Sequence, residues 1–295
     1  DDLEIRDTVK GKFVYANVLE EGNPTITLLA DLIPHWIRGI QGSRFMRWGA
    51  GEIRFSRPIR WILSLLDNEI IHTSVLDSDP QIFTSNLTRG HRLYSDNILI
   101  DEANSYLKDL SNAGVIVDRN KRLEFIRELV INKATELNGK PNLSKELLEQ
   151  LTDLVESPSI IVGDFDESFL SLPSEVLCTV MHVHQRYIPI FNKEIINDPL
   201  TLDSKEILLP KFLCISNGLP SANEVIRLGN QRVLKARFSD AEFFVKSDLA
   251  IKSTDRLEKL KSVVFADGLG SLFDRVKRIE WVANCLLGNL NIYNL

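Results

Sequence analysis

The sequence from Arg44 to Trp61 reads RFMRWGAGEIRFSRPIRW. It contains one acidic residue, Glu52, and five arginines: Arg44, Arg47, Arg54, Arg57 and Arg60. The local net charge is therefore +4, in a chain whose formal net charge is -6. Positive charge is concentrated in this stretch instead of being spread along the chain.

The aromatic residues among these arginines admit two interpretations. Arginines that alternate with Phe and Trp rings are typical of a surface that binds phosphates through the planar guanidinium and stacks on bases. The same residues can pack arginine stems over Trp rings where two domains meet. Composition alone favours the packing interpretation, because only a small fraction of arginine clusters touch nucleic acid.

Several motifs further along the chain favour the nucleic-acid interpretation. After RFMRWG and FSRPIRW come TRGHR (88–92), LVESPSIIVGDFDESFLSLPSEVL (154–177), MHVHQRY (181–187), ISN (215–217), LGNQRVLKARFSDAEFFVKSD (228–248) and LKSVVFADGLGSLFDRVKRIEWVA (260–283). In this order they resemble the N-terminal and central part of the beta subunit of bacterial-type, heterotetrameric glycyl-tRNA synthetase. Several motifs in one order are a more specific signal than any single motif.

The resemblance implies an α+β fold. It implies a mixed β-sheet module similar to the B3/B4 domain of the phenylalanyl-tRNA synthetase beta subunit, followed by a helical region. The expected parts are an N-terminal α/β segment at residues 1–55, the B3/B4-like domain at 56–220 and the helical region at 221–295. In the family, the helical region leads towards a His-Asp-type domain and an anticodon-binding domain, which are not found in these 295 residues.

The function that the resemblance implies is the attachment of glycine to tRNA. In the family, the alpha subunit activates glycine with ATP and Mg²⁺, while the beta subunit supplies most of the tRNA recognition. We therefore expect this chain to hold no catalytic residue, metal or cofactor, and to be inactive alone. Its expected partners are glycine tRNA and the alpha subunit, in an assembly of two alpha and two beta subunits. The sequence contains no GxxxxGK[ST] phosphate loop, GxSxG elbow or kinase signature, which agrees with this expectation.

The residues expected to contact tRNA are mostly basic and lie in these motifs. They are Arg44, Arg47, Arg57, Arg60, Arg89, His91, Arg92, His184, Gln185, Arg186 and Arg232. In TRGHR, Gly90 permits a positive φ or a close backbone approach, so the motif is expected to form a turn that presents its two arginines and its histidine. Arg237 is expected to pair with Asp240, three residues later on the same helix.

Two clusters raise the question of a metal site. His182 and His184 would share one face of a strand, a spacing found in some metal sites. No cysteine or carboxylate ligand stands at a recognised spacing nearby, so a structural or RNA-contact role for His184 to Arg186 is favoured. The acidic GDFDES run at 163–168 lacks the ligand pattern of a calcium loop and is interpreted as a solvated loop.

The middle of the chain is acidic, in contrast to the arginine-rich stretch before it. Residues 140–210 contain five Lys and Arg against twelve Asp and Glu, a local net charge of -7. Such a surface repels a phosphate backbone. We therefore expect this acidic middle to face solvent or a protein partner.

Two alternative functions stay open at this point. The likeness to the B3/B4 module suggests an active or relic editing site that hydrolyses mischarged tRNA. Glycine is the smallest amino acid, so larger competitors are excluded by bulk and an editing site has no smaller product to remove. The other alternative is a purely structural module for subunit assembly.

Hydrophobic periodicity and turn residues predict the secondary structure. Strands are expected near residues 12–20, 70–75 and 98–100. A helix capped by Thr25 or Thr27 is expected to kink or break early at Pro34. Further helices are expected at 57–66 with Pro58 in the first turn, at 101–112 capped by Asp101, at 118–138, at 228–244, and as a pair over 253–287 that is broken at ADGLGS.

Length and composition set the remaining expectations. The chain is long enough for about two domains, and its ends, Asp1 and the run GNLNIYNL, suggest a fragment or a processed chain. Three isolated cysteines in apolar surroundings predict buried thiols in a reducing compartment. The sequence contains no run of about 18 apolar residues, so no membrane span is predicted. The expected location is the cytoplasm, or an organelle matrix if a leader has been removed.

Overall fold

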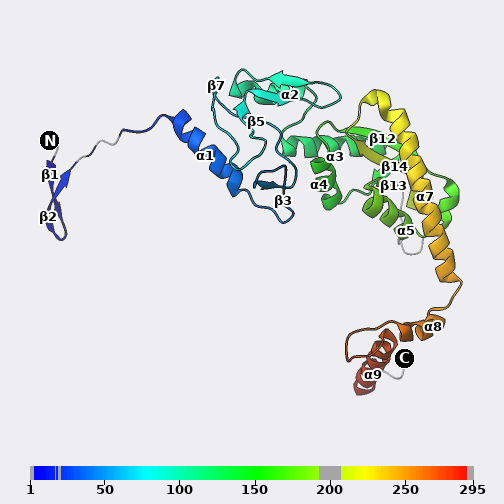
Figure 1. The fold of residues 1–295 in the computed structure, drawn as a ribbon. Coiled ribbons are helices and arrows are strands. Elements are labelled where there is room, and N and C mark those ends of the chain that lie inside the picture. Colours follow the sequence, from blue (N-terminus) through cyan, green and yellow to red (C-terminus); the bar gives the residue numbers. More distant parts are fainter. Residues whose placement is uncertain (1–2, 17, 19–20, 193–206, 291–295) are drawn as a thin grey trace. The chain divides into compact units, whose positions relative to one another are not determined.

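The computed structural model describes residues 3–16, 18, 21–192 and 207–290 (Figure 1). Contacts divide the chain into two compact units, 1–122 and 123–295, and each is described by itself. Both units combine helices with small sheets, so the α+β class is confirmed. The division into parts at residues 55 and 220 stays a prediction. No helix within the described residues is both long and apolar enough to cross a lipid bilayer.

A four-stranded antiparallel sheet organises the second unit. Its strands are β11 (Gly139–Pro141), β13 (Ile188–Asn192), β14 (Leu208–Ser216) and β12 (Ser159–Asp164), and they lie in this order across the sheet. The long central strand β14 pairs with β12 over six residues and with β13 on its other side. Because side chains alternate between the faces of a strand, the apolar run in β14 supplies both faces of the sheet at once.

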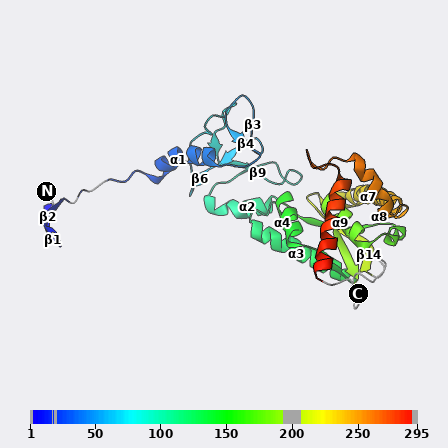
Figure 2. The ribbon, with the colours of Figure 1, turned by 90° about the horizontal axis from the view of Figure 1, so that it is seen from below.

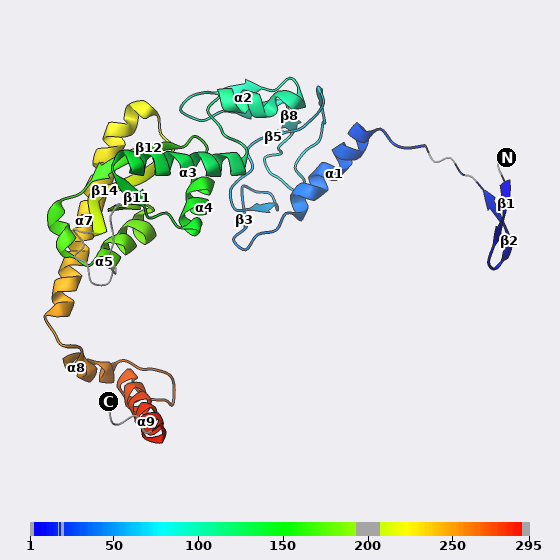
Figure 3. The same cartoon turned by 180° about the vertical axis from the view of Figure 1, so that it is seen from behind.

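Helices cover both faces of this sheet (Figures 1, 2 and 3). On one face, α3 (Arg119–Glu136) and α4 (Lys145–Leu154) pack against Ile188, Ile190, Leu213 and Ile215. On the other face, α5 (Ser174–Thr179) and α7 (Asn223–Leu249) pack against Leu208 and Phe212. The second unit is therefore a three-layer arrangement of helices, sheet and helices.

The face below α7 is built around one aromatic ring. Phe212 is fully buried and stacks on Tyr187, with ring centroids 4.6 Å apart. Its neighbour across the sheet is Gly163, and a Cβ atom on that glycine would lie 2.2 Å from the Phe212 ring. Glycine is needed here because the ring occupies the space of a side chain. Phe238 from α7 is also fully buried in this cluster.

Turns and short helices connect these elements. They are η2 (Glu167–Ser171), η3 (Val180–Gln185, a π-helix) and η4 (Pro220–Ala222). Ser144 caps α4, because its side chain accepts a hydrogen bond from the Leu147 backbone N–H. Asp118 caps α3 in the same way and accepts from the backbone N–H groups of Lys121 at 3.1 Å and Asn120 at 2.8 Å. These hydrogen bonds, that from Lys121 above all, lower the pKa of Asp118 below its usual range.

The last part of the chain is helical. Its elements are α8 (Ser253–Arg256), η5 (Leu257–Ser262) and α9 (Leu272–Asn289). The ADGLGS run separates η5 from α9, and both of its glycines have positive φ, at 72° and 77°. Ser271 and Asp274 then form a capping box at the start of α9. The predicted helical pair with a break at ADGLGS is confirmed.

The first unit consists of short strand pairs and two α-helices. The elements are β1 (Leu3–Thr8), β2 (Gly11–Ala16), α1 (Thr25–Gly39), β3 (Met46–Arg47), β4 (Arg54–Phe55), β5 (Ile62–Leu63), β6 (Leu65–Leu66), β7 (Glu69–Ile70), β8 (Thr84–Ser85), β9 (Leu87–Arg89), β10 (Asn97–Leu99), η1 (Ala103–Ser105) and α2 (Tyr106–Asn112). Four pairs are antiparallel, and β5 with β8 is parallel. A hydrogen bond of 2.8 Å from Thr73 Oγ1 to the Ala30 carbonyl ties α1 to the segment after β7.

The helix predicted at 57–66 is wrong. Ile62 and Leu63 pair with β8, and Leu65 and Leu66 form a tight hairpin with β7. Asp67, the first of the two residues between the hairpin strands, has a φ of 54°, which a tight hairpin turn requires and a right-handed helix forbids. The short apolar run ILSLL at 62–66, interrupted only by Ser64, fits a strand as well as a helix, and the pairing partners decide between the two.

The other predicted helices and strands agree with the structure to different extents. Helices α3 and α7 match their predictions, whereas the predicted helix at 101–112 is split, because η1 precedes an α2 that begins at Tyr106. Helix α1 starts after Pro24 without a side-chain cap, and it continues past Pro34 to Gly39, so the threonine cap and the early break are wrong. Of the strand expected near 12–20, residues 17, 19 and 20 lie outside the described residues.

The three cysteines differ in their surroundings. Cys178 and Cys214 are half-buried, and burial raises the pKa of each thiol to about 11. Cys285 on α9 is exposed, so the prediction of three buried thiols is wrong for this residue. No residue of helix α9 is buried against the described parts of the chain.

We expect Gly163→Ala to destabilise the chain by about 1–3 kcal/mol, because its Cβ atom would collide with the Phe212 ring. The matched control is Gly229→Ala on α7, where nothing lies within 4 Å of the added Cβ atom. That change is expected to stabilise the chain by about 0.5–1 kcal/mol, because alanine favours a helix interior. Urea denaturation followed by circular dichroism measures both. A neutral Gly163→Ala variant would contradict the packing of Phe212.

We expect iodoacetamide at pH about 8 to alkylate Cys285 far faster than Cys178 or Cys214. With a thiol pKa of about 11, only about one thousandth of each half-buried thiol is ionised at this pH, and the thiolate is the nucleophile. Peptide mass mapping over a time course gives the three rates. Labelling of the half-buried pair should accelerate as the pH rises towards 11. Equal rates at all three cysteines near neutral pH would refute the assignment.

Candidate nucleic-acid interface

The arginine-rich stretch folds into a small hairpin in the first unit. Strands β3 and β4 pair so that Arg47 stands opposite Arg54 and Met46 opposite Phe55. Arg47 Nη1 bonds Glu52 Oε1 at 2.8 Å, an exposed ion pair. An exposed pair of this kind is weak, at about 0–1 kcal/mol, so it leaves Arg47 available to a stronger anion.

Aromatic packing and backbone bonds hold the hairpin in shape. The Trp48 indole N–H donates to the Phe55 carbonyl at 2.9 Å, and the rings of Phe45 and Phe55 are stacked with centroids 5.2 Å apart. The backbone N–H of Glu52 donates to the Asp77 carbonyl at 2.8 Å. These contacts place the arginines on a hairpin whose backbone has a defined path.

Two glycines allow this close backbone contact. A Cβ atom at Gly49 would lie 2.2 Å from the Asp79 carbonyl oxygen, and one at Gly51 would lie 2.3 Å from that of Asp77. Gly49 also has a φ of 71°, which favours glycine. Side chains at positions 49 and 51 would push the WGAGE segment away from the Asp77–Asp79 turn, so both positions need glycine.

Four arginines of the stretch are available to a ligand. Arg44, Arg54, Arg57 and Arg60 are exposed, and they form no ion pair with any residue in the described parts of the chain. Their positive charge is therefore uncompensated at short range. Such side chains are suited to phosphate contacts.

The TRGHR motif lies beside the end of this stretch. The Arg89 guanidinium is 4.6 Å from the centroid of the Trp61 ring, a cation–π contact. Arg89 and Arg92 are exposed, as predicted for this motif. The stack leaves one planar arginine fixed on an aromatic ring.

His91 is a correction to the prediction. Its side chain is fully buried, its backbone N–H donates to the Ala113 carbonyl at 2.9 Å, and its ring lies 5.0 Å from that of Tyr94. A Cβ atom at Gly90 would lie 2.6 Å from the Ala113 side chain, so the expected close approach is present. That approach presses the motif against the end of α2 and directs His91 into the core. His91 is therefore a packing residue and contacts no RNA from this position.

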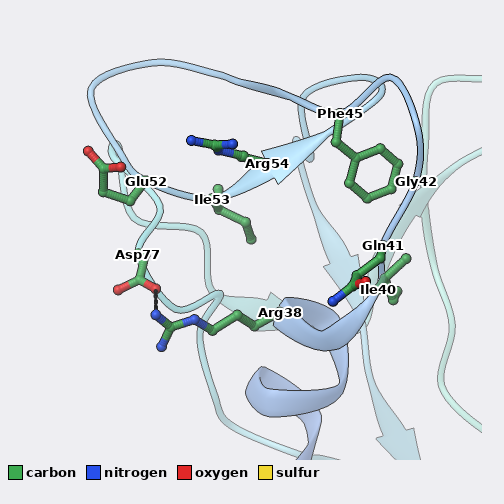
Figure 4. A pocket seen from close by; sticks show the side chains of 9 residues that line it. All are labelled: Arg38, Ile40, Gln41, Gly42, Phe45, Glu52, Ile53, Arg54 and Asp77. Carbon is green, nitrogen blue, oxygen red and sulfur yellow. Dashed lines mark ion pairs between the residues drawn. The ribbon is translucent and has the colours of Figure 1, made fainter.

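A cavity of about 410 Å³ opens between the hairpin and the end of α1 (Figure 4). Its lining residues are Arg38, Ile40, Gln41, Gly42, Phe45, Glu52, Ile53, Arg54 and Asp77. Arg38 forms an ion pair of 3.2 Å with Asp77 across one wall. Arg54 belongs to the five-arginine run but is absent from the predicted contacts, and no sequence pattern connects Arg38 or Asp77 to it.

The second unit holds the remaining predicted contacts. His184 and Gln185 lie on the π-helix η3 and not on a strand, so the predicted strand is wrong. The next residue, Arg186, ends the helix with a φ of 54°, and its Nε lies 3.4 Å from Gln150 Oε1. His184 and Arg186 are exposed. The described residues contain no group of three or more His, Cys, Asp or Glu arranged to hold a metal ion.

The basic helix α7 carries the last predicted contact, Arg232, which is exposed. Arg237 and Asp240 form no ion pair in the described structure, so that predicted pair is wrong. Intrahelical pairs on α7 join Arg227 to Glu224 and Lys246 to Glu242. The hydrogen bonds of the first pair raise the pKa of Arg227 and lower that of Glu224.

Comparison with known proteins decides the family. A sequence model described as glycyl-tRNA synthetase beta subunit matches residues 1–294. The chain belongs to this family. The glycine–tRNA ligase beta subunit of Trichodesmium erythraeum (strain IMS101) is 42% identical over 293 residues, which are 99% of this chain and 40% of that protein. The proteins of the same name from Acaryochloris marina (strain MBIC 11017) and Clostridioides difficile (strain 630) are 41% and 33% identical, over 97% and 99% of this chain and 39% and 40% of theirs.

Membership of the glycyl-tRNA synthetase beta family confirms the resemblance seen in the motifs. The family names refer to a ligase of protein biosynthesis, an aminoacyl-tRNA synthetase. The chain spans about two fifths of the length of these relatives. The comparisons concern the family and do not test the individual contact residues, which stay predictions apart from the correction at His91.

Proposed function

We propose that this chain is the part of a glycine–tRNA ligase beta subunit that binds and positions tRNA. Glycine would be attached on the alpha subunit, which would use ATP and Mg²⁺, while this chain binds neither and is inactive alone. The proposal places the assembly in the cytoplasm. The observation that carries it is the set of exposed, unpaired arginines on and beside the β3–β4 hairpin, which are Arg44, Arg54, Arg57 and Arg60. Backbone bonds to Asp77 and Asp79 hold the connection between the two strands of this hairpin.

The proposed mechanism is electrostatic and depends on shape. Phosphates of the tRNA would contact Arg44, Arg57 and Arg60, while the stacked Arg89 would offer a plane to a base or a second phosphate. In the second unit, Arg186, which lies within the acidic middle, and Arg232 on α7 would add contacts. Part of the acidic middle, residues 193–206, lies outside the described residues. The rest of it would stay away from the RNA backbone by repulsion.

The likeness of residues 56–220 to the B3/B4 editing module is also part of this proposal. We propose that the scaffold persists without hydrolysis, because glycine leaves no smaller product for an editing site to remove. Hydrolysis of mischarged tRNA by the chain would overturn this part of the proposal.

A second role in subunit assembly is favoured by one observation. Helix α9 exposes large apolar side chains, among them Ile279 at 57%, Trp281 at 68% and Leu286 at 56% exposure. Ile279 and Leu286 line one groove together with Phe265 and Leu269, and exposed apolar surface of this kind is typical of protein interfaces. We propose that it contacts the alpha subunit or another part of the beta subunit, alongside the tRNA role of the first unit.

The experiment that tests the tRNA role is a binding titration in a salt series. Glycine tRNA and an unrelated tRNA are each titrated with the 295-residue chain from about 50 mM to about 200 mM salt, a range over which phosphate contacts lose much of their strength. A linear fall of log affinity with log salt supports phosphate contacts, and a preference for glycine tRNA adds recognition. No binding at the lowest salt would sink the tRNA role and leave assembly as the leading function.

We expect the double variant Arg57→Glu, Arg60→Glu to weaken tRNA binding about tenfold or more and to flatten the salt dependence, because two phosphate contacts become repulsive. The matched control reverses Lys252 and Lys259, which are exposed on the second unit and carry the same charge. Affinity is measured by fluorescence anisotropy, and circular dichroism confirms that both variants are folded. An equal loss in both would show that only net charge matters. Unfolding of the arginine variant alone would assign these arginines to the structure.

A further inference from the structure

The cavity beside the arginine hairpin has walls of three kinds (Figure 4). Phe45, Ile40 and Ile53 supply apolar surface, and Gln41 supplies an amide with both a donor and an acceptor. The charged groups are Arg38, Arg54, Glu52 and Asp77. Its volume of about 410 Å³ lies in the range of about 300–1,000 Å³ that small-molecule sites occupy.

The charges inside the cavity balance, while those around it do not. Two guanidinium groups and two carboxylates line it, so its formal charge is zero. The exposed Arg44 and Arg57 flank the β3–β4 hairpin in the sequence and have no acidic partner among the described residues. A phosphate therefore gains little electrostatic attraction inside the cavity and more from the exposed arginines outside it. A planar, neutral group with several donors and acceptors suits the inside.

We propose that this cavity binds one unpaired base of the tRNA, with the flanking phosphates on the arginines outside. The proposal rests on the proposed tRNA role and names which part of the RNA this site takes. Single-stranded loops and ends are the parts of an RNA whose bases can be turned out and bound in this way. The base carries an exocyclic amino group, as adenine, cytosine and guanine do.

The preference for an amino group follows from the carboxylates. Asp77 uses one oxygen in its ion pair with Arg38, and Glu52 uses one in its pair with Arg47. An ionised carboxylate has about four acceptor positions, so each can accept a further hydrogen bond. An amino group brings two N–H donors, whereas uracil has a single ring N–H. Arg54 and the Gln41 amide can donate to the ring nitrogen or carbonyl of the base.

The aromatic wall is already in place. Phe45 is stacked on Phe55, with an angle of 22° between the ring planes. A Cβ atom at Gly42 would lie 2.3 Å from the Phe45 ring, so glycine allows the ring to lie across this loop. A bound base can therefore stack on a ring that needs no rearrangement, which strengthens binding without selecting a sequence.

The test uses fluorescein-labelled hexanucleotides of adenine, cytosine and uracil, titrated with the 295-residue chain. We expect the adenine and cytosine oligomers to bind about fivefold or more tightly than the uracil oligomer, because uracil lacks the amino group. The double variant Gln41→Ala, Phe45→Leu should lose this preference, because the base is no longer held in the cavity against the Asp77 and Glu52 carboxylates. It should keep the salt dependence, since it changes no charge. Gly42→Ala, which displaces the Phe45 ring, should do the same. The control Arg57→Gln should weaken all three oligomers equally and keep the preference.

Two results would overturn the assignment: equal binding of the three oligomers, or a preference that survives in both cavity variants. Ultraviolet cross-linking of the bound cytosine oligomer, followed by peptide mapping, checks the site in the unmodified chain. An adduct confined to peptides that contain neither residues 38–54 nor Asp77 also rejects it. If the chain binds glycine tRNA but shows no base preference, the tRNA role stands and the cavity assignment fails. If the chain binds no tRNA, the proposed function itself fails.

Discussion

The arginine surface depends on the contact between the backbone of Gly49–Glu52 and the turn at Asp77–Asp79. The N–H groups of Ala50 and Glu52 donate to the Asp79 and Asp77 carbonyls, and the two glycines keep the chains close enough for these bonds. Without this contact, the arginine stretch would be a loop with many conformations, and ordering it on RNA would cost conformational entropy. The same turn carries the Asp77 carboxylate that pairs with Arg38 on α1. One backbone contact thus connects the hairpin, the end of α1 and the cavity between them.

The second unit obeys a different constraint, which is the supply of apolar residues to both faces of one sheet. Strand β14 alternates Phe212 and Cys214 towards α7 with Leu213 and Ile215 towards α3 and α4. A sheet covered on both faces keeps its apolar residues inside, and polar groups remain for its helix surfaces and edges. Acidic residues can therefore gather on this unit without weakening its core.

The parts that sequence predicted correctly are those in which the pattern is long and local. Helix α3 and helix α7 each repeat their apolar positions over several turns, and ADGLGS contains glycines with the positive φ that its turn needs. The errors occur where a distant partner decides. Residues 62–66 become strands because β7 and β8 pair with them, and His91 is buried because the end of α2 lies against Gly90. The motifs indicated the family correctly, since ordered similarity needs no knowledge of contacts.

The candidate site shows the same division between local and distant signals. The exposed arginines follow from composition, because charged side chains are seldom buried without a partner. The cavity does not follow from composition, because Arg38, Arg54 and Asp77 come from three separate segments. Its neutrality is a property of the fold: each carboxylate lies near an arginine, and the surplus of positive charge is left on the outer surface. A chain with a net charge of -6 can present a local surface that attracts a polyanion, because electrostatic interactions in salt solution fade within about 10 Å.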